Sequence, residues 1–233
     1  LAAKSLDDLK KLREAGLTRI HIGLESGSNE VLELVKKGCR AEHHIEGINK
    51  AIEAGFEVCC YVMPGLGGRA LSEIHAHETA RVLQAINPHH IRLRTMFLTD
   101  EIPMYQKVIS GEMELLEEDE VVAEIRTLIM GLRGLSGYVV SDHDHNLLMD
   151  IKGNLTDDID ELDRKLLEFL NLPKAMRDGF IIAKRTGRLR SLSHFLGDKK
   201  EQEAVLPLAD AFRKAGEGSL MKGLLKQFRP KLF

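Results

Sequence analysis

A single carboxylate stands at the end of a strand-like segment near the start of the sequence. The segment RIHIGLESGS, residues 19–28, alternates in polarity and ends in a small polar cluster that contains Glu25. Because alternate side chains of a strand share a face, His21, Gly23 and Glu25 point the same way. Gly23 keeps that face open, so we interpret Glu25 as a contact to a ligand. The alternative is a carboxylate that caps the helix expected from Ser28 onward.

Two arginines share one face of a later strand-like segment, HIRLRTMFL, residues 90–98. Arg92 and Arg94 alternate there with apolar side chains. Cations enclosed in a fold usually meet carboxylates. Those carboxylates belong either to the protein or to a ligand, and the sequence leaves both open.

Two groups of histidines support a metal site as a rival interpretation. His75 and His77 fall on a predicted helix, where side chains two positions apart point about 200° apart and cannot share an ion. The second group, Asp142–His145, is better placed, because imidazole and carboxylate suit zinc, iron or nickel. A TIM-barrel-like metallohydrolase that uses this group is one alternative function. Polar capping of a helix that begins near Asn146 is the other interpretation of the same residues.

The three cysteines, Cys39, Cys59 and Cys60, are too few and too badly spaced for a disulfide framework or a zinc site. Neighbouring side chains of a strand point to opposite faces, so Cys59 and Cys60 cannot share one metal. Such cysteine use fits a reducing compartment. The sequence has no run of about 18 apolar residues and no leader, so we expect a soluble, cytoplasmic protein without membrane contact.

The elements that position these residues repeat along the first hundred positions. EAGLTRIHIGLESGS, from Glu14, and EAGFEVCCYVMPGLGG, from Glu53, align as a helix end, a strand and a polar loop. The segment 90–98 closes a third unit. Strands that alternate with helices predict parallel βα units, whose site is built by the loops after the strands. The loop MPGLGG lacks the lysine and hydroxyl of a phosphate-binding P-loop, which argues against nucleoside triphosphate chemistry.

The strand signal ends near residue 98, and the remaining sequence is predicted as mostly helical. An acidic stretch, GEMELLEEDE, and a short apolar segment, GYVVSDH, interrupt it. We predict helices over residues 121–132, 146–152, 156–170 and 173–184, with shorter pieces to 228. This pattern divides the chain into residues 1–110, with the βα units, and residues 111–233, a helical extension.

The charge distribution raises a binding module as another alternative. The net charge is −3, but residues 184–233 carry 12 Lys/Arg against 5 Asp/Glu. Such a tail could bind RNA or an acidic partner, or form an ordinary solvated helix face. Aromatic residues make up 5% of the sequence and Trp is absent, so few side chains could stack on bases. We therefore rank RNA binding below a substrate-covering lid.

Three segments in order resemble radical S-adenosylmethionine (SAM) enzymes. RIHIGLESGSNEVLELVKKG is similar to their fourth strand and following helix, in the branch near oxygen-independent coproporphyrinogen III oxidases, methylthiotransferases and the Elongator catalytic subunit. AGFEVCCYVMPGLGG resembles the fifth strand, and NPHHIRLRTMFLTDEIPMY the sixth with the loop that closes the adenine pocket. The resemblance covers about residues 1–105. Residues 137–190 resemble the helical extension of some uncharacterised members more weakly.

This resemblance implies an α/β fold, a partial TIM-type barrel. The chain would supply the last three βα units of a six-unit barrel, followed by a mostly helical C-terminal region. It also implies an Fe-S oxidoreductase with a [4Fe-4S] cluster held by three cysteines. Reductive cleavage of SAM would then give a 5′-deoxyadenosyl radical that abstracts hydrogen from a substrate, whose identity the sequence does not reveal.

The resemblance also implies which residues bind SAM. Glu25 and Ser26 would contact its ribose or methionine part, and Lys37 would pair with a carboxylate there. The backbone at four further positions would border the ligand: Pro64, Gly65, Leu98 and Thr99. Arg94 would be a second partner for the carboxylate of SAM. For Lys37, a solvated lysine favoured by the helix dipole is the alternative.

One departure from the family pattern limits what this chain would do alone. The cluster motif Cys-x3-Cys-x2-Cys is absent, and Cys39, Cys59 and Cys60 cannot replace it. We therefore expect the first three strands and the cluster loop to precede Leu1. We predict that the chain by itself neither assembles the cluster nor cleaves SAM, and we expect no cofactor bound to it. An exposed edge of the strand RIHIGL would invite another chain, so we expect a homo-oligomer.

Overall fold

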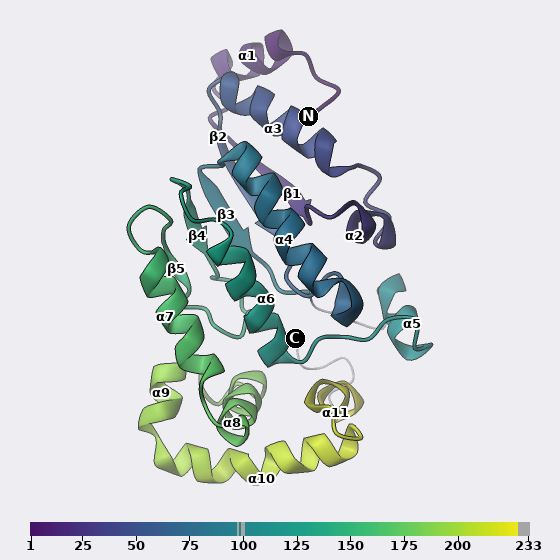
Figure 1. The fold of residues 1–233 in the computed structure, drawn as a ribbon, viewed down its shortest axis with the longest axis vertical. Helices are drawn as coiled ribbons and strands as arrows, with labels where there is room; N and C mark the ends of the chain where they lie inside the picture. The colour runs from purple at the N-terminus through teal and green to yellow at the C-terminus, as the bar shows by residue number, and fades with distance from the viewer. Residues whose placement is uncertain (97, 99–100, 228–233) are drawn as a thin grey trace.

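The computed structural model describes all residues except 97, 99–100 and 228–233 (Figure 1). The described residues form one five-stranded sheet in the order β1-β2-β3-β4-β5. Its strands are β1 (Arg19–Glu25), β2 (Glu57–Val62), β3 (His90–Leu93), β4 (Tyr138–Val140) and β5 (Lys152–Asn154). Strands β1 to β4 are parallel, and β5 runs antiparallel to β4. The predicted α/β architecture, a partial barrel followed by helices, is confirmed.

The sheet extends further along the chain than we predicted. The apolar segment GYVVSDH supplies β4, and residues 146–152, predicted as a helix, form a loop that leads into β5. The helix prediction was wrong because Leu147, Leu148 and Ile151 follow helical spacing but fill the core from a loop. Strands of three residues are too short to show alternation. The division into domains at residue 110 stays a prediction, and strands from beyond this point continue the sheet.

Six helices lie within residues 6–130 of the described chain, and the helix predicted over residues 121–132 spans Glu118–Met130. They are α1 (Leu6–Glu14), α2 (Asn29–Leu34), α3 (Ala41–Glu53), α4 (Gly68–Ile86), α5 (Pro103–Ile109) and α6 (Glu118–Met130). Ser5 caps α1 by accepting a hydrogen bond from the Asp8 amide. Gly16 and Gly55 follow α1 and α3 at positive φ, a conformation that glycine adopts without a Cβ clash.

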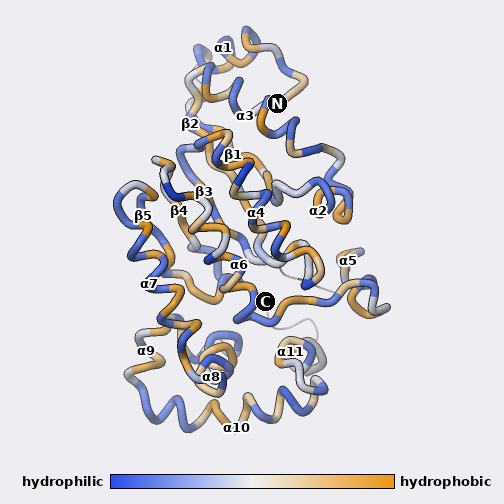
Figure 2. Tube along the Cα trace, in the orientation of Figure 1, coloured by the Kyte–Doolittle hydropathy of each residue, from blue (hydrophilic) through white to orange (hydrophobic). Residues whose placement is uncertain are grey.

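The two faces of the sheet differ in chemistry. Helices α3, α4 and α6 lie on one side of it (Figure 1), and α4 contacts both others. The strand side chains beneath these helices are apolar and fully buried: Val58, Cys60, Val62, Ile91, Leu93 and Val139. The opposite face carries the exposed His21 and three partly exposed side chains, Glu57, Tyr61 and Arg92. Figure 2 shows the mixture of hydrophilic and hydrophobic positions along the helices that lets each bury one side.

The C-terminal helices form a group at the end of the molecule away from α1 (Figure 1). They are α7 (Ile159–Leu170), α8 (Lys174–Arg185), α9 (Leu192–Gly197), α10 (Lys199–Ala215) and α11 (Leu220–Gln227). The ring of Phe180 contacts those of Phe169 and Phe195, with centroids 6.0 and 5.7 Å apart. Among the described residues, no helix is long and apolar enough to cross a membrane.

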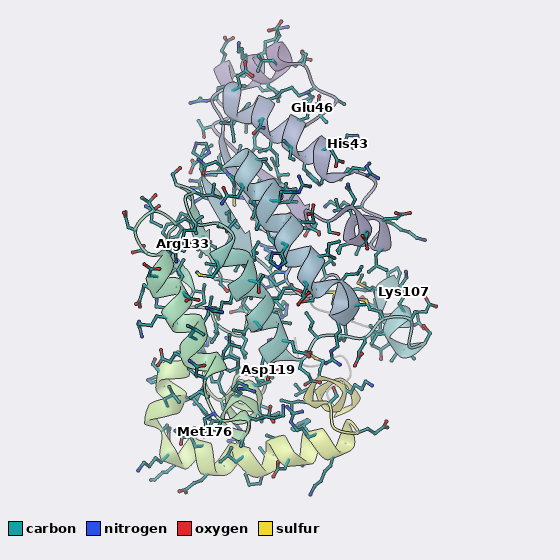
Figure 3. The ribbon with its side chains drawn as sticks, in the orientation of Figure 1. His43, Glu46, Lys107, Asp119, Arg133 and Met176 are labelled. Carbon is teal, nitrogen blue, oxygen red and sulfur yellow. The ribbon has the colours of Figure 1, made fainter. Side chains whose placement is uncertain are left out.

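The acidic stretch of the sequence joins the two halves of the molecule. Glu117 accepts a hydrogen bond from the Leu220 amide, at 3.1 Å, at the start of α11. Glu118 bonds to Arg185 of α8 at 2.6 Å. Asp119 (labelled in Figure 3, at the start of α6) pairs with Arg177 of α8 at 3.2 Å. Three consecutive carboxylates therefore hold the C-terminal helices on α6.

Candidate functional site

Glu25 ends β1 in a conformation that few residues adopt. Its φ is 62°, in the left-handed region, and the register of β1 against β2 shifts between Gly23 and Glu25. Its carbonyl oxygen accepts a hydrogen bond from the Met63 amide at 3.0 Å, which ties it to the end of β2. A non-glycine residue held there costs about 1–3 kcal/mol, and such strain clusters at functional sites.

The Glu25 side chain folds back over Gly23 and meets a cation. A Cβ atom at Gly23 would collide with the Glu25 carboxylate, so the predicted shared face is confirmed. Lys37 Nζ lies 3.2 Å from Glu25 Oε1, and the two side chains keep 29% and 21% of their exposure. The capping alternative for Glu25 is wrong, because the Ser28 hydroxyl caps α2 by accepting from the Val31 amide. A charge pair open to solvent therefore stands at the tip of β1.

The Ser26 side chain is fully buried and occupied by the protein itself. Its Oγ lies 2.8 Å from His75 Nδ1 and accepts a hydrogen bond from the Ser28 amide at 3.0 Å. Through these two hydrogen bonds the Ser26 hydroxyl stabilises the conformation of the loop after β1. Direct contact of Ser26 with a ligand stays a prediction.

The loops after β2 and β3 contact each other. The Pro64 carbonyl accepts a hydrogen bond from the Met96 amide at 2.8 Å. Gly65 has a φ of 84°, and its amide donates to Glu124 Oε1 at 2.7 Å. Leu98 is buried. Thr99 lies outside the described residues, so its predicted contact stays a prediction.

The two arginines of the polar face have different partners. Arg92 bonds to both oxygens of Asp142, at 2.8 and 2.6 Å, and the pKa of that carboxyl is lowered mainly by this contact. Arg94 lies over the Tyr61 ring, 4.6 Å from its centroid. Within the described part of the chain, no carboxylate lies within 4 Å of the Arg94 guanidinium. The protein supplies the carboxylate for Arg92, and a ligand carboxylate stays the predicted partner of Arg94.

Two functional candidates that we did not predict from the sequence lie beneath the loops. His75 of α4 and Glu124 of α6 are buried, and their side chains approach to 3.7 Å. Burial lowers the pKa of His75 to about 4 and raises the pKa of Glu124 to about 7. One signal was available: Ser72, His75 and Thr79 recur at helical spacing on a face of α4 that is otherwise apolar.

The cysteines of this chain do not fit an iron–sulfur cluster. Cys59 and Cys60 are consecutive residues of β2, and Cys39 Sγ lies 3.1 Å from His44 Nε2. Burial raises the pKa of Cys60 to about 12, so that thiol stays protonated, whereas cluster ligands are thiolates. The part of the chain that the structure describes contains no group of three or more His, Cys, Asp or Glu that could hold a metal ion.

The two rival sites have found internal partners. Asp142 is taken by Arg92, and the rings of His143 and His145 lie 4.8 Å apart. Burial lowers the pKa of both histidines. In the basic tail, Arg213 bonds to Asp178 at 2.6 Å. Among the described residues, Asp142 and Arg213 are thus engaged by the protein itself, and these two contacts add no support for a metallohydrolase or an RNA-binding module.

Comparison with known proteins supports the family resemblance. Residues 3–81 match the sequence model of the Radical SAM superfamily. Over these residues the chain is similar to that superfamily. The match contains β1 and β2, the loops after them and most of α4, so the Glu25–Lys37 pair lies within radical SAM sequence.

Curated relatives come from the predicted branch. The chain is 27% identical to the heme chaperone HemW of Bacillus subtilis over 156 residues. This alignment covers 65% of this chain and 40% of HemW. It is 24% identical to the uncharacterized protein YtqA of B. subtilis, over 50% of this chain and 36% of that protein. A tRNA uridine(34) acetyltransferase of Methanocaldococcus infernus is 22% identical over 51% of this chain and 22% of that protein. The chain thus spans less than half the length of these relatives.

A solved structure shows the same fold. Elp3 of Methanocaldococcus infernus, with residues 1–46 deleted, superimposes with a TM-score of 0.53 at 20% identity. The likeness covers 72% of this chain and 40% of that chain. The fold that this chain shares with Elp3 therefore extends beyond residue 81, into the strands and helices that follow.

Proposed function

We propose that this chain forms the methionine-binding side of the SAM site in a radical SAM enzyme. The observation that carries the proposal is the partly exposed Glu25–Lys37 pair at the strained tip of β1, within the residues that match the radical SAM model. The methionine part of SAM ends in an ammonium and a carboxylate. A neighbouring carboxylate and ammonium of the protein match this zwitterion, since each charge finds its opposite.

The remaining predicted residues complete the proposed site. Arg94, held against the Tyr61 ring, supplies a second cation for the carboxylate of SAM. The backbone after β2 and β3, at Pro64, Gly65, Leu98 and Thr99, borders the adenosine part. Ser26 acts through its loop. With SAM held by these residues and one electron delivered to a cluster beside it, the two groups would supply the chemistry that abstracts hydrogen from a substrate.

We further propose that the complete enzyme is an Fe-S oxidoreductase whose cluster cysteines lie outside these 233 residues. The chemistry of Cys39, Cys59 and Cys60 supports this proposal, because none is placed to share a cluster. Anaerobic incubation of this chain with iron and sulfide, followed by desalting, should leave no bound iron. Stoichiometric iron and sulfide after desalting would contradict it.

Calorimetric titration with SAM tests the binding proposal. The sequence alone led us to expect no cofactor on this chain, whereas the Glu25–Lys37 pair leads us to propose that the chain binds SAM. Glu25→Gln and Lys37→Gln should each weaken this binding by at least about tenfold, because one charge of the zwitterion loses its partner. The matched control is Glu161→Gln on α7, which removes an exposed carboxylate paired with Arg164 and should leave the affinity unchanged. No binding at about 1 mM SAM, or equal affinity of all three variants, would overturn the proposal.

Self-association through β1 stays a prediction. β1 is an outer strand of the sheet among the described residues, and a cavity of about 380 Å³ lies beside it, lined in part by Ile20, His21 and Ile22. Light scattering checks the prediction, and a single monomeric species over a wide concentration range would count against it.

A further inference from the structure

A network of buried polar side chains supports both loops of the candidate site. It links the Ser26–Ser28 loop after β1 to the Met63–Gly67 loop after β2 through α4 and α6. His75 sits at its centre, with Nδ1 2.8 Å from Ser26 Oγ and Nε2 3.1 Å from the Met63 carbonyl oxygen. Thr79 Oγ1 accepts a hydrogen bond from the Gly27 amide at 2.9 Å. Three positions in two loops therefore depend on one turn of α4.

The donors and acceptors fix the direction of these bonds. A carbonyl oxygen can only accept, so His75 Nε2 carries a hydrogen; when the imidazole is neutral, Nδ1 has none and accepts from the Ser26 hydroxyl. The Ser26 oxygen in turn accepts from the Ser28 amide. This direction requires a neutral imidazole, in agreement with the low pKa of His75. A serine–histidine pair for acyl transfer is excluded, because Ser26 is fully buried and both nitrogens of His75 are engaged.

Glu124 supports the second loop from α6. Its Oε1 accepts from the Gly65 amide at 2.7 Å, and its Oε2 accepts from the Ser72 hydroxyl at 2.5 Å. His75, 3.7 Å away on α4, is the titratable side chain that faces it among the described residues. Because both donors point at Glu124, its carboxylate form satisfies them together. A carboxylic acid must donate its own hydrogen and loses one of the two bonds.

We propose that His75 and Glu124 are positioning residues that hold the two strand-end loops in the shape that binds SAM. This inference rests on the proposed function, since SAM is the ligand whose affinity it governs. It adds that the Glu124 carboxylate, not its acid form, supports binding. Since burial raises the pKa of Glu124 to about 7, affinity should fall on acidification across neutral pH.

Glu124→Gln provides the test, because the amide keeps an acceptor for Gly65, donates to Ser72 and does not titrate. SAM affinity of the natural chain should fall about tenfold from pH 8 to pH 6, as the carboxylate fraction falls. In the Glu124→Gln variant, the change in SAM affinity between pH 8 and pH 6 should be about tenfold smaller. The titration of SAM itself affects both proteins equally and so does not contribute to this difference. Equal pH dependence of the two proteins would overturn the inference and leave the proposed function intact.

Amide hydrogen exchange of the ligand-free chain gives a second, independent readout. Glu124→Ala should raise the exchange rate of the Gly65 amide at least about tenfold, and His75→Gln should do so for the Ser28 amide. The control Glu161→Ala should change neither. If SAM fails to bind at every pH while these exchange rates respond, the proposed function fails and the role of the two residues in fixing the loops stands. Unchanged exchange at both amides would overturn that role.

Discussion

Glu25 and Glu118 are both carboxylates paired with a cation from a distant segment, yet their surroundings are opposite. Glu25 has a left-handed backbone, a single contact of 3.2 Å to Lys37, and side chains with about a quarter of their exposure left. Glu118 lies in a helix, and it and Arg185 keep 5% and 9% of theirs. Backbone strain and solvent access distinguish Glu25–Lys37 as an ion pair that a ligand can contact. Full burial marks a pair that joins two parts of the fold.

The largest effect should follow from breaking the buried pair. Glu118→Ala leaves the Arg185 charge buried without its partner, so the free energy of unfolding should fall by about 3–5 kcal/mol. Denaturant unfolding measures this loss. The double variant Glu118→Met, Arg185→Met should recover most of the stability, because it removes both charges. A loss below about 1 kcal/mol for the single variant would place this pair among surface ion pairs.

A second effect concerns pH. Burial of the Glu124 carboxylate costs more than its hydrogen bonds to Ser72 and Gly65 offset, so its folded pKa lies above the unfolded value. Protonation therefore stabilises the fold as a whole, although it releases one of the two loop contacts. That contribution is complete below about pH 4.5 and is lost as pH rises through about 7, a change of about 3 kcal/mol. The free energy of unfolding of the natural chain should therefore decline relative to Glu124→Gln over this range.

The titration of His75 changes the free energy of unfolding with pH in the opposite direction to that of Glu124. It does not affect the difference between the natural chain and Glu124→Gln. Its folded pKa is lowered to about 4, so its contribution is present above about pH 6.5 and is lost as pH falls. Both proteins contain it. Unfolding curves of the two proteins that run parallel from pH 4.5 to pH 7.5 would contradict the raised pKa of Glu124.

The smallest effect sharpens the contrast at Glu25. Glu25→Gly and Glu25→Ala both remove the carboxylate, but glycine adopts a φ of 62° without strain. The Gly variant should be about 1 kcal/mol more stable than the Ala variant, and both should lose SAM affinity equally. Thermal unfolding compares their stabilities. Equal stability would mean that the backbone at the end of β1 is not strained.

Much of the first half of the fold could be predicted, because its signals are local. The repeated helix–strand–loop units, the caps at Ser5 and Ser28, and the shared face of Gly23 and Glu25 depend on residues a few positions apart. β4, β5 and the loop before β5 could not be predicted, since their conformation depends on pairing with β3 and on core packing. The same holds for Glu124, whose partner Gly65 is 59 positions away.

The sequence by itself determined the alternation of strands and helices, the family likeness and the absence of a cysteine triplet. Each of these depends on residue types and their spacing over short stretches of the chain. Only the tertiary structure decided the partners of its charges. It paired Glu25 with Lys37, gave Arg92 a protein carboxylate, and brought His75 and Glu124 together beneath two loops. Charge pairing and burial depend on distance in space, which side chains far apart in sequence acquire when the sheet and helices pack.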